Sequence, residues 1–238
     1  MAEKFFIFKP TNSSCGRGIK VMPGSTKISK TEEVIASCYL DKPLLINNKK
    51  FDMRMYVVVT SFNPLRVYFY HEGLARFATE EYSNDPKVLK NKFVHLTNFS
   101  INKRNIKFVR NDNRTGSAPR KSSKAIDEDD IVDEDPEQES SSKWSLTFLK
   151  KYLRKQKQEE GYTFKKDEDI FSGCHDVIIK TLISAEPSIV KEMNKVGNRQ
   201  KCCFEVFGFD IMFDQNLKPW VLEVNCLPSL SSSSVFDK

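Results

Sequence analysis

The sequence predicts an α+β fold made mainly of antiparallel sheet with packed helices. Segments 51–61 and 65–77 are rich in strand-forming residues and are separated by a turn at Asn63-Pro64. A second pair of strand-like segments, 204–213 and 219–225, closes the chain, and apolar residues recur at helical spacing in 146–153 and 170–193. With 238 residues, of which 39% are hydrophobic, the chain can bury a core as one large domain or two small lobes.

The N-terminal region is expected to begin with a hairpin. Residues 5–8 read as a short buried strand, 11–18 as a loop of small residues, and 19–22 as a second strand. A short helix is expected over Lys30 to Cys38, and another strand over 43–46 precedes the two long strands. This half of the chain should therefore be mostly antiparallel sheet.

The composition changes between Arg104 and Ser142, first to Arg, Lys, Ser and Gly and then to acidic residues, so we expect a disordered insertion. Nine acids lie between residues 127 and 139 without a base, and removing them raises the formal charge from +6 to +15. The remainder is thus strongly basic and should attract polyanions, although charge alone does not choose between nucleic acid and an acidic peptide.

The helical segments of the C-terminal region are predicted to pack on the core. Leu146, Leu149 and Leu153 share one helix face, and in 170–193 the core-facing residues are expected to be Val177, Ile178, Leu182 and Ile183. Pro187 is expected to kink or divide this second helix.

Several classes of protein are not indicated. No apolar run reaches the roughly 20 residues of a membrane span, and the start lacks a secretory signal, so we expect a soluble intracellular protein. The six cysteines form no pair of C-x2-C knuckles and the three histidines stand apart, so we expect reduced thiols and no zinc site.

The closing hairpin carries oxygen-bearing side chains. A two-residue turn at Gln215-Asn216 would pair Ile211 with Trp220, Phe209 with Leu222 and Phe207 with Val224. Because side chains alternate along strands, Asp210, Glu223 and Asn225 would share the opposite face, with Asp210 diagonal to Glu223. Such groups suit Mg²⁺, which prefers oxygen ligands. The alternative is that they are solvated residues on an outer sheet face.

A second polar face is expected in the strand that begins at residue 50. Lys50, Asp52 and Arg54 alternate with apolar residues, so they line one strand face while the other joins the core. They could form a ladder of cross-strand ion pairs. Arg76 on the next strand adds a guanidinium that suits carboxylates or phosphates.

The loop before Gly18 has the composition of a phosphate-binding hairpin. Lys9 precedes it, and Gly16 and Gly18 would let backbone N–H groups approach an anion. The loop matches neither the Walker pattern nor G-x-G-x-x-G, so alone it is a weak signal. It supports a phosphate site only together with the polar residues of the closing hairpin and of the strand that begins at residue 50.

Together these motifs resemble the ordered motifs of the tubulin tyrosine ligase-like family, and most closely those of its polyglutamylating members. The motifs are Lys9-Pro10, Gly16-Arg17-Gly18, Lys50-Phe51-Asp52-Met53-Arg54, Gly73-Leu74-Ala75-Arg76-Phe77, His95-Leu96-Thr97-Asn98, Lys143-Trp144, Phe207-Gly208-Phe209-Asp210 and Lys218-Pro219-Trp220-Val221-Leu222-Glu223-Val224-Asn225. The resemblance implies an ATP-grasp fold, with a central region in 1–103, the insertion in 104–142 and a C-terminal region in 143–238. Family members have a further N-terminal segment, so the N-terminal lobe is expected to be incomplete.

The resemblance also implies functional residues at matching positions. It places ATP beside Lys9, Cys15, Gly16, Ser37, Cys38, Tyr39, Leu40, Lys50, Phe51, Asp52, Thr97 and Asn98. It assigns Mg²⁺ to Asp210, Glu223 and Asn225, and the incoming amino acid to Arg76, Phe99, Ser100 and Lys143. Arg54 and Glu223 take the catalytic roles. Cys15, Ser37 and Phe99 depart from residues that are common in the family.

The implied activity is that of an ATP- and Mg²⁺-dependent ligase that joins free glutamate to the C-terminal tails of α- or β-tubulin. Glycine or tyrosine as the amino acid, and a non-catalytic microtubule-binding relative, remain alternatives. Cys226 stands where chain-elongating members often have His, which favours an enzyme that starts glutamate chains. The expected location is the cytoplasm and cytoskeleton, including a cilium or basal body, and we expect a monomer that binds neither nucleic acid nor membrane.

Overall fold

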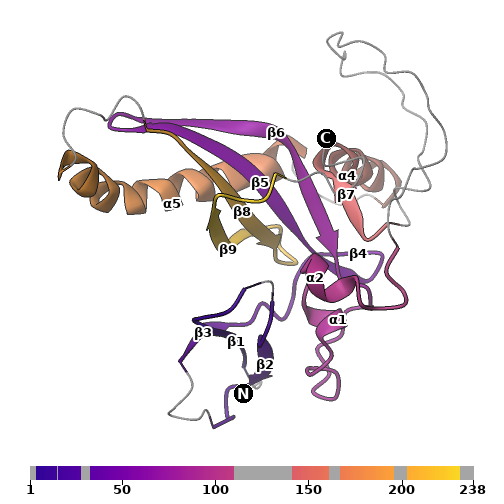
Figure 1. Ribbon diagram of the computed structural model, residues 1–238. Coiled ribbons are helices and arrows are strands. Elements are labelled where there is room, and N and C mark those ends of the chain that lie inside the picture. Colours follow the sequence, from indigo (N-terminus) through magenta and orange to yellow (C-terminus); the bar gives the residue numbers. More distant parts are fainter. Residues whose placement is uncertain are drawn as a thin grey trace.

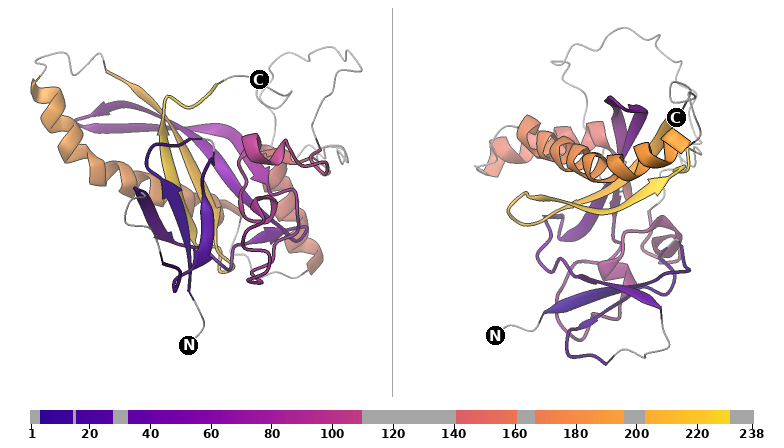
Figure 2. Two further views of the ribbon diagram at one scale, coloured as in Figure 1. Left: turned by 60° about the horizontal axis from the view of Figure 1, so that its bottom comes forward. Right: turned by 90° about the vertical axis from the view of Figure 1, so that its left-hand side faces the viewer.

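The computed structural model describes residues 4–14, 16–27, 33–109, 141–160, 167–195 and 203–230. These residues form an α+β fold of two antiparallel sheets and four helices (Figure 1). The long helix α5 lies along one side of the larger sheet, and the smaller sheet lies on the other side (Figure 2). Within the described residues, none of the helices combines the length and the apolar character needed to span a membrane.

The smaller sheet has three strands in the order β2-β1-β3. The expected hairpin is confirmed, since β1 (Phe5–Pro10) pairs antiparallel with β2 (Lys20–Pro23). The helix expected over residues 30–38 is wrong, because Val34–Cys38 is strand β3 and pairs with the other edge of β1. The spacing of Val34 and Cys38 fits a helix, but the free edge of β1 offers backbone hydrogen bonds that make the segment extended.

The larger sheet has six strands, with the order β7-β6-β5-β8-β9 and β4 paired to β5. The two long strands are confirmed, and a cis Asn63-Pro64 bond lies in the turn between them. Two short helices follow β6. The remaining elements are β4 (Leu45–Ile46), β5 (Lys49–Phe62), β6 (Leu65–Phe77), α1 (Lys92–His95), α2 (Phe99–Asn102), β7 (Lys143–Ser145), β8 (Glu205–Phe213) and β9 (Pro219–Cys226).

The main core lies between the larger sheet and the helices α4 (Leu146–Glu160) and α5 (Asp167–Lys195). Alternate residues of β5, among them Met53 and Val57, are fully buried against this core, as period-2 patterning predicts. Burying each such apolar side chain stabilises the fold by about 1.5–3 kcal/mol. The intervening residues of β5 face away from the helices, and they include Lys50, Asp52 and Arg54.

Helix α5 differs from expectation in two ways. It is continuous from Asp167 to Lys195, so of the two outcomes expected at Pro187, a kink or a division, the division is wrong. Residues on both sides of the proline, including Leu182 and Val190, pack on the core, and this packing holds the helix together. Ile178 and Leu182 are buried as expected, but Ile183 is 53% exposed and does not face the core.

The flanks of the predicted insertion are ordered, contrary to the boundaries expected from composition. Asn105 Nδ2 donates to Thr79 Oγ1 at 2.9 Å, which holds the segment that follows α2. Val109 and Ser142 bind each other, with Val109 N donating to Ser142 Oγ at 3.2 Å and Ser142 N to Val109 O at 3.1 Å. The chain thus leaves and re-enters the fold at one point. Residues 110–140, to which the rest of that prediction refers, lie outside the described residues.

The register of the closing hairpin also differs from the predicted one. The two-residue turn is wrong: Asp214 N donates to Lys218 O at 3.1 Å, so three residues form the loop. The Asp214 carboxylate accepts from the backbone N–H groups of Asn216 and Lys218, and Leu217 has a positive φ of 64°, as longer hairpin loops require. A bulge beside Asp210 then shifts β9, so Asp210 lies directly opposite Glu223.

Candidate active site

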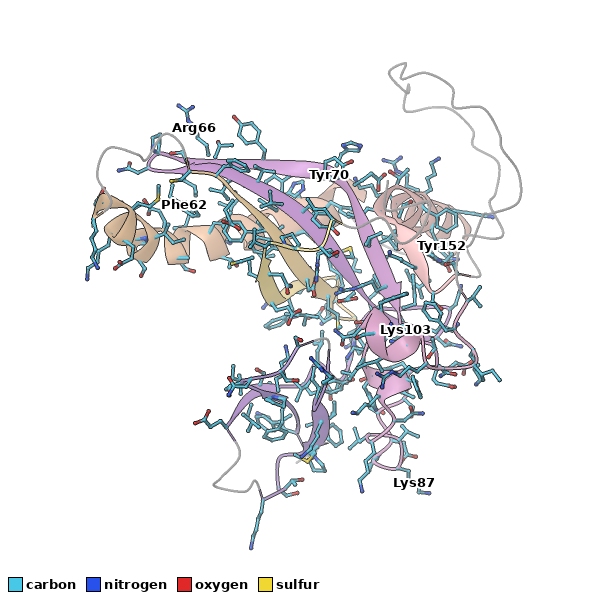
Figure 3. The ribbon with its side chains drawn as sticks, in the orientation of Figure 1. Phe62, Arg66, Tyr70, Lys87, Lys103 and Tyr152 are labelled. Atoms are coloured by element: carbon cyan, nitrogen blue, oxygen red, sulfur yellow. The ribbon has the colours of Figure 1, made fainter. Side chains whose placement is uncertain are left out.

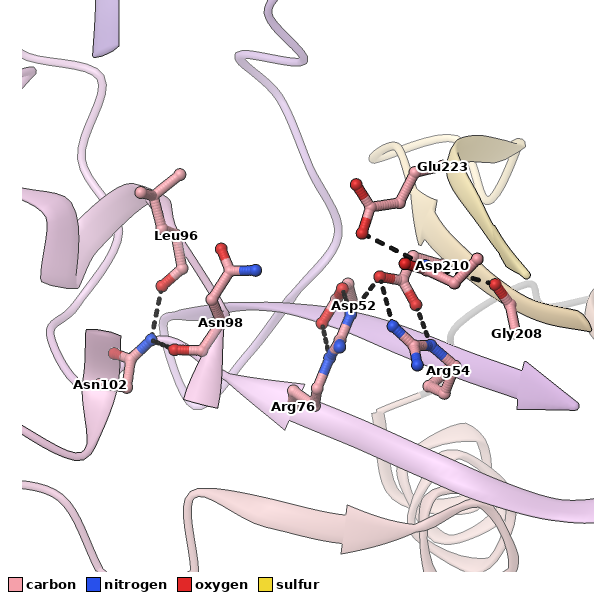
Figure 4. A network of polar contacts seen from close by, with 10 residues as sticks. Asp52, Arg54, Arg76, Leu96, Asn98, Asn102, Gly208, Asp210 and Glu223 are labelled. Atoms are coloured by element: carbon pink, nitrogen blue, oxygen red, sulfur yellow. Dashed lines mark hydrogen bonds and ion pairs between the residues drawn. The ribbon is translucent and has the colours of Figure 1, made fainter. Parts of the chain in front are cut away.

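Four charged side chains meet on the sheet face that points away from the helices. Asp52 on β5 lies opposite Arg76 on β6, and Arg54 on β5 lies opposite Asp210 on β8. Three adjacent strands therefore carry two acids and two bases next to each other, as Figure 4 shows. Both carboxylates are almost fully buried and both arginines are mostly buried.

The four charges are joined into one network. Asp210 accepts two hydrogen bonds from Arg54, one of them at 3.0 Å from Nη2, and it also pairs with Arg76 Nη2 at 2.8 Å. Arg76 Nε donates to Asp52 Oδ1 at 2.9 Å, and its Nη2 donates to the other oxygen. Burial alone would raise the pKa of Asp210, but the hydrogen bonds from Arg54 and the charge of Arg76 outweigh it and lower that pKa.

The same network stabilises the charge on Arg76. Burial would lower the pKa of its guanidinium, but the charges of Asp52 and Asp210 outweigh burial and raise the pKa. The cross-strand ion pairs considered for this face are therefore present, and the network extends to the closing hairpin. With the pKa of Arg76 raised and that of Asp210 lowered, both of these groups remain charged at neutral pH.

Gly208 makes room for Arg54 in this network. A Cβ atom at Gly208 would lie 3.0 Å from Arg54 Cδ and 2.9 Å from Pro228 Cβ, which is closer than side-chain atoms normally approach. The absence of a side chain at this position lets the guanidinium lie across β8 and reach Asp210.

Glu223 and Asn225 lie beside Asp210. Asp210 is opposite Glu223 (Figure 4). Asn225 Nδ2 donates to Glu223 Oε1 at 3.3 Å. Two carboxylates and an amide oxygen form a set of hard oxygen ligands that fits Mg²⁺ chemically. Asp210 is shared with the two arginines, and within the described ranges no group of three or more His, Cys, Asp and Glu residues is placed to hold a metal ion. An ion here would draw on Asn225 as well as the carboxylates.

A cavity of ≈ 300 Å³ opens over Asp52, Arg76, Asp210 and Glu223, between the two sheets, whereas Arg54 and Asn225 are not among its lining residues. One part of its wall is apolar and includes Ile7, Met212 and Leu222, while Lys50, Asp52, Arg76, Asp210 and Glu223 form a charged part. Its volume is at the lower end of the roughly 300–1,000 Å³ of small-molecule sites. The cavity brings together many of the residues assigned to ATP: Lys9, Ser37, Cys38, Tyr39, Leu40, Lys50, Asp52, Thr97 and Asn98.

A buried chain of hydrogen bonds orients Lys50 in this cavity. Lys50 Nζ donates to Tyr39 Oη at 2.9 Å, and Tyr39 Oη lies 2.9 Å from His95 Nδ1. His95 Nε2 lies 3.1 Å from the carbonyl oxygen of Val88, so Nε2 carries the proton, Nδ1 accepts from Tyr39, and the Tyr39 oxygen is free to accept from Lys50. Burial lowers the pKa of His95 to about 4, which keeps its ring neutral.

Lys50 itself fits an anionic ligand. Its side chain is 3% exposed, and no carboxylate within the described residues forms a salt bridge with it. Burial lowers its pKa to about 7, with the charge of Asp52 opposing and that of Lys9 adding to the effect. An ammonium has three donors, so a phosphate oxygen would satisfy donors that Tyr39 leaves unused and would favour the charged form. The cavity therefore fits the phosphates of a nucleotide.

The other predicted site residues are more dispersed. Phe51 is in the core, stacked on Phe77, and so lies on the opposite sheet face from the cavity. Gly16 and Ser100 line a different cavity, described below. Phe99 is 40% exposed and makes an edge contact with Phe108. Lys143 lies opposite Arg76 on β7, and Cys15 falls outside the described residues.

Two kinds of cavity residue were not predicted from sequence. His95 belongs to the motif His95-Leu96-Thr97-Asn98, but no feature of the sequence assigns it a role. Its link to Lys50 passes through Tyr39 and is visible only in the folded structure. Leu96, Met212, Trp220 and Leu222 line the cavity but look like ordinary core residues. A histidine that is adjacent in sequence to predicted site residues could have been recognised as a candidate site residue. Apolar residues of the cavity wall have no sequence feature that distinguishes them from core residues.

The family profile of the tubulin-tyrosine ligase family matches residues 1–132 and 122–238. Tubulin polyglutamylase TTLL5 of Mus musculus is 40% identical over 233 residues, which cover 98% of this chain and 15% of the relative. Tubulin monoglutamylase TTLL4 of Mus musculus is 40% identical over 98% of this chain and 17% of the relative. For tubulin polyglutamylase TTLL6 of Mus musculus, 40% identity covers 99% of this chain and 25% of the relative.

The chain thus spans between 15% and 25% of the length of these relatives, but nearly all of its own residues match them. The matched region includes the charged network, the cavity and the closing hairpin. The chain belongs to the tubulin-tyrosine ligase family.

Proposed function

We propose that this chain is the catalytic core of an ATP-dependent ligase that adds glutamate, through an isopeptide bond, to glutamate side chains in the C-terminal tails of α- or β-tubulin. The observation that carries this proposal is the cavity, which is lined by a buried lysine, an arginine and the carboxylates paired with that arginine. Its relatives are named tubulin polyglutamylases and a tubulin monoglutamylase, which supports glutamate and tubulin as the substrates.

The residues present fit ATP and Mg²⁺. In this proposal Lys9, Lys50, Asp52, Thr97 and Asn98 lie around ATP, and Asp210, Glu223 and Asn225 hold the metal. The nucleotide would supply the phosphoryl group that converts an acceptor carboxylate into an acyl phosphate, and the metal would supply positive charge next to the phosphates. We infer an ATP-grasp arrangement, in which the two sheets lie on either side of the nucleotide.

The arginines have separate tasks. Arg54 is held by Asp210, and in this proposal it would offset negative charge that develops during phosphoryl transfer. Arg76, held by Asp52, would orient a carboxylate of the incoming glutamate so that its amine reaches the activated carbonyl. The amine attacks the carbonyl carbon, phosphate leaves with the bonding electrons of the broken C–O bond, and the amine loses a proton.

Two finer statements belong to the same proposal. Cys226, at the end of β9, lies opposite Phe207 and next to Asn225. Because this position holds Cys rather than His, we propose that the enzyme starts glutamate chains on its acceptor. An enzyme acting on microtubules would work at the cytoskeleton, including cilia and basal bodies.

Competition among labelled amino acids tests the proposal directly. The protein is incubated with MgATP, a tubulin-tail peptide and equal amounts of labelled glutamate, glycine and tyrosine. We expect glutamate to be incorporated, because its additional carboxylate can pair with the positive charge of Arg76 at the edge of the cavity. Mass spectrometry should locate the label on a glutamate side chain. Preferred incorporation of glycine or tyrosine, or no ATP-dependent incorporation, would refute the proposed activity.

The pKa of Lys50 predicts how ATP binding depends on pH. The ammonium form binds phosphate, and this form is dominant below the pKa of about 7 and lost above it. ATP affinity should therefore weaken as pH rises from about 7 to about 9, by up to roughly tenfold per pH unit. In Lys50→Arg the guanidinium stays charged, so this decline should be absent. Calorimetric titration of both proteins with MgATP checks the prediction, and equal pH profiles would contradict it.

A further inference from the structure

A second cavity, of ≈ 520 Å³, lies between the β1–β2 loop and the helices α1 and α2. Four cations line it, Arg17, Lys90, Lys92 and Arg104, together with the half-buried Phe93 and Ile101. We call this the basic groove. No Asp or Glu is among its lining residues, and within the described part of the chain none of the four cations forms a salt bridge.

The groove has a defined shape as well as charge. Arg17 Nε and Nη2 lie 3.4 Å and 3.3 Å from Ser14 O and Oγ, which fixes the loop that carries Arg17. On the other side, the Asn91 side chain caps α1 by accepting from Phe93 N at 3.0 Å. Four like charges around one groove repel each other, so an anionic ligand that lies among them is favoured.

The basic groove adjoins the nucleotide cavity. Gly16 lines the groove, and a Cβ atom at Gly16 would lie 2.8 Å from Oδ1 of Asn98, which lines the nucleotide cavity. The same position is 2.6 Å from Ile101 Cδ1. A single layer of residues therefore separates the two sites, so a ligand longer than one residue could occupy both.

We propose that the basic groove binds an acidic, glutamate-rich peptide segment of the acceptor protein, next to the residue that is modified. The inference rests on the proposed function for the identity of the acceptor. The nucleotide has its own cavity, in which Lys50 and Arg76 provide positive charge. An extended peptide presents a side chain about every 3.3 Å, so successive carboxylates can meet successive cations. Phe93 is the one aromatic residue among the described residues that line the groove, whereas binding of single-stranded nucleic acid normally uses several rings on which successive bases stack.

A charge-removal experiment tests this inference. In the groove variant, Arg17, Lys90, Lys92 and Arg104 are replaced by Gln. In the control variant, four exposed cations elsewhere are replaced by Gln: Arg66, Lys151, Lys180 and Lys191. Figure 3 shows Arg66 at the far end of the β5–β6 hairpin, well away from Lys87 and Lys103, which are close in sequence to the groove residues. Both variants lose the same charge.

Binding is measured by the fluorescence anisotropy of a labelled peptide of about ten glutamates, without nucleotide, and then by the KM for a tubulin-tail peptide. We expect the groove variant to bind the peptide about tenfold or more weakly, since each exposed ion pair contributes a modest amount and four are lost. The control variant should change by about twofold or less, through long-range charge alone. The KM for ATP should be unchanged in both variants.

A labelled single-stranded RNA is titrated in parallel as a second probe. Three outcomes would overturn the inference: equal weakening of peptide binding in both variants, a raised KM for ATP in the groove variant with unchanged peptide binding, or a loss of RNA binding in the groove variant with unchanged peptide binding. The proposed function fails separately. If the unaltered protein binds the acidic peptide through the groove but ligates no amino acid to it, the ligase proposal is wrong and the groove assignment stands.

Discussion

Glu223→Gln is expected to reduce kcat for ligation by about 10²–10³-fold. Glu223 lies opposite Asp210 and accepts from Asn225, so its carboxylate completes the oxygen set proposed for Mg²⁺. The Gln side chain has nearly the same shape but no negative charge, and it should lower metal binding in the presence of nucleotide. Glu223 is exposed, so the free energy of unfolding should change by no more than about 0.5 kcal/mol.

Radiolabelled glutamate incorporation into tubulin, followed for both proteins at saturating MgATP, measures this effect. Glu186→Gln is the control, because Glu186 is half-buried on α5 and lines neither cavity. Stabilisation by MgATP in a thermal-shift assay should be present in the control and reduced in Glu223→Gln. Ligation by Glu223→Gln at the parental rate would show that Glu223 has no role in the reaction.

Trp144→Ala should have the largest effect on stability, lowering the free energy of unfolding by about 3–5 kcal/mol. Trp144 is 1% exposed and joins strand β7 to helix α4. Its ring centroid is 4.6 Å from that of Phe77, 4.9 Å from Phe148 and 5.1 Å from Tyr152. Removing the indole leaves a cavity at this aromatic cluster. Since domains of this size are stable by about 5–15 kcal/mol, much of the total would be lost.

Trp144→Phe provides the matched comparison. It keeps part of the ring volume and also removes an indole N–H that has no hydrogen-bond partner among the described residues. Leaving such a donor buried costs about 1–3 kcal/mol, so the Phe variant should lose clearly less stability than the Ala variant. Urea unfolding followed by fluorescence and circular dichroism measures both. Equal losses would mean that the cavity at this position has little effect.

The long strands and helices could be predicted from sequence because their patterns are extensive. In β5, buried and polar residues alternate over most of the strand, and α4 repeats leucine at helical spacing. The pattern failed where it was short or where packing decided. β3 has five residues and is extended because β1 offers a free edge, and α5 continues through Pro187 because both of its halves pack on the core.

The candidate site was predictable in its composition but not in its contacts. Alternation correctly placed Lys50, Asp52 and Arg54 on one face. The register of β9 was wrong, however, because it depends on the Asp214 turn and on a bulge, and neither has a distinct sequence signature. The two errors offset each other, so Asp210 and Glu223 still lie together. The sharing of Asp210 between two arginines arises from three separate strands and requires the folded structure.

The hydrogen bonds between Val109 and Ser142 make this point suitable for inserting or replacing a segment of chain. Because Val109 and Ser142 are hydrogen-bonded to each other, the pairing of β6 with β7 does not depend on the length of the segment that connects these two residues. A connection of a different length could therefore be accommodated here without altering the larger sheet. For the same reason, a fluorescent reporter grafted in place of residues 110–140 should leave the larger sheet intact and would make the protein visible in cells.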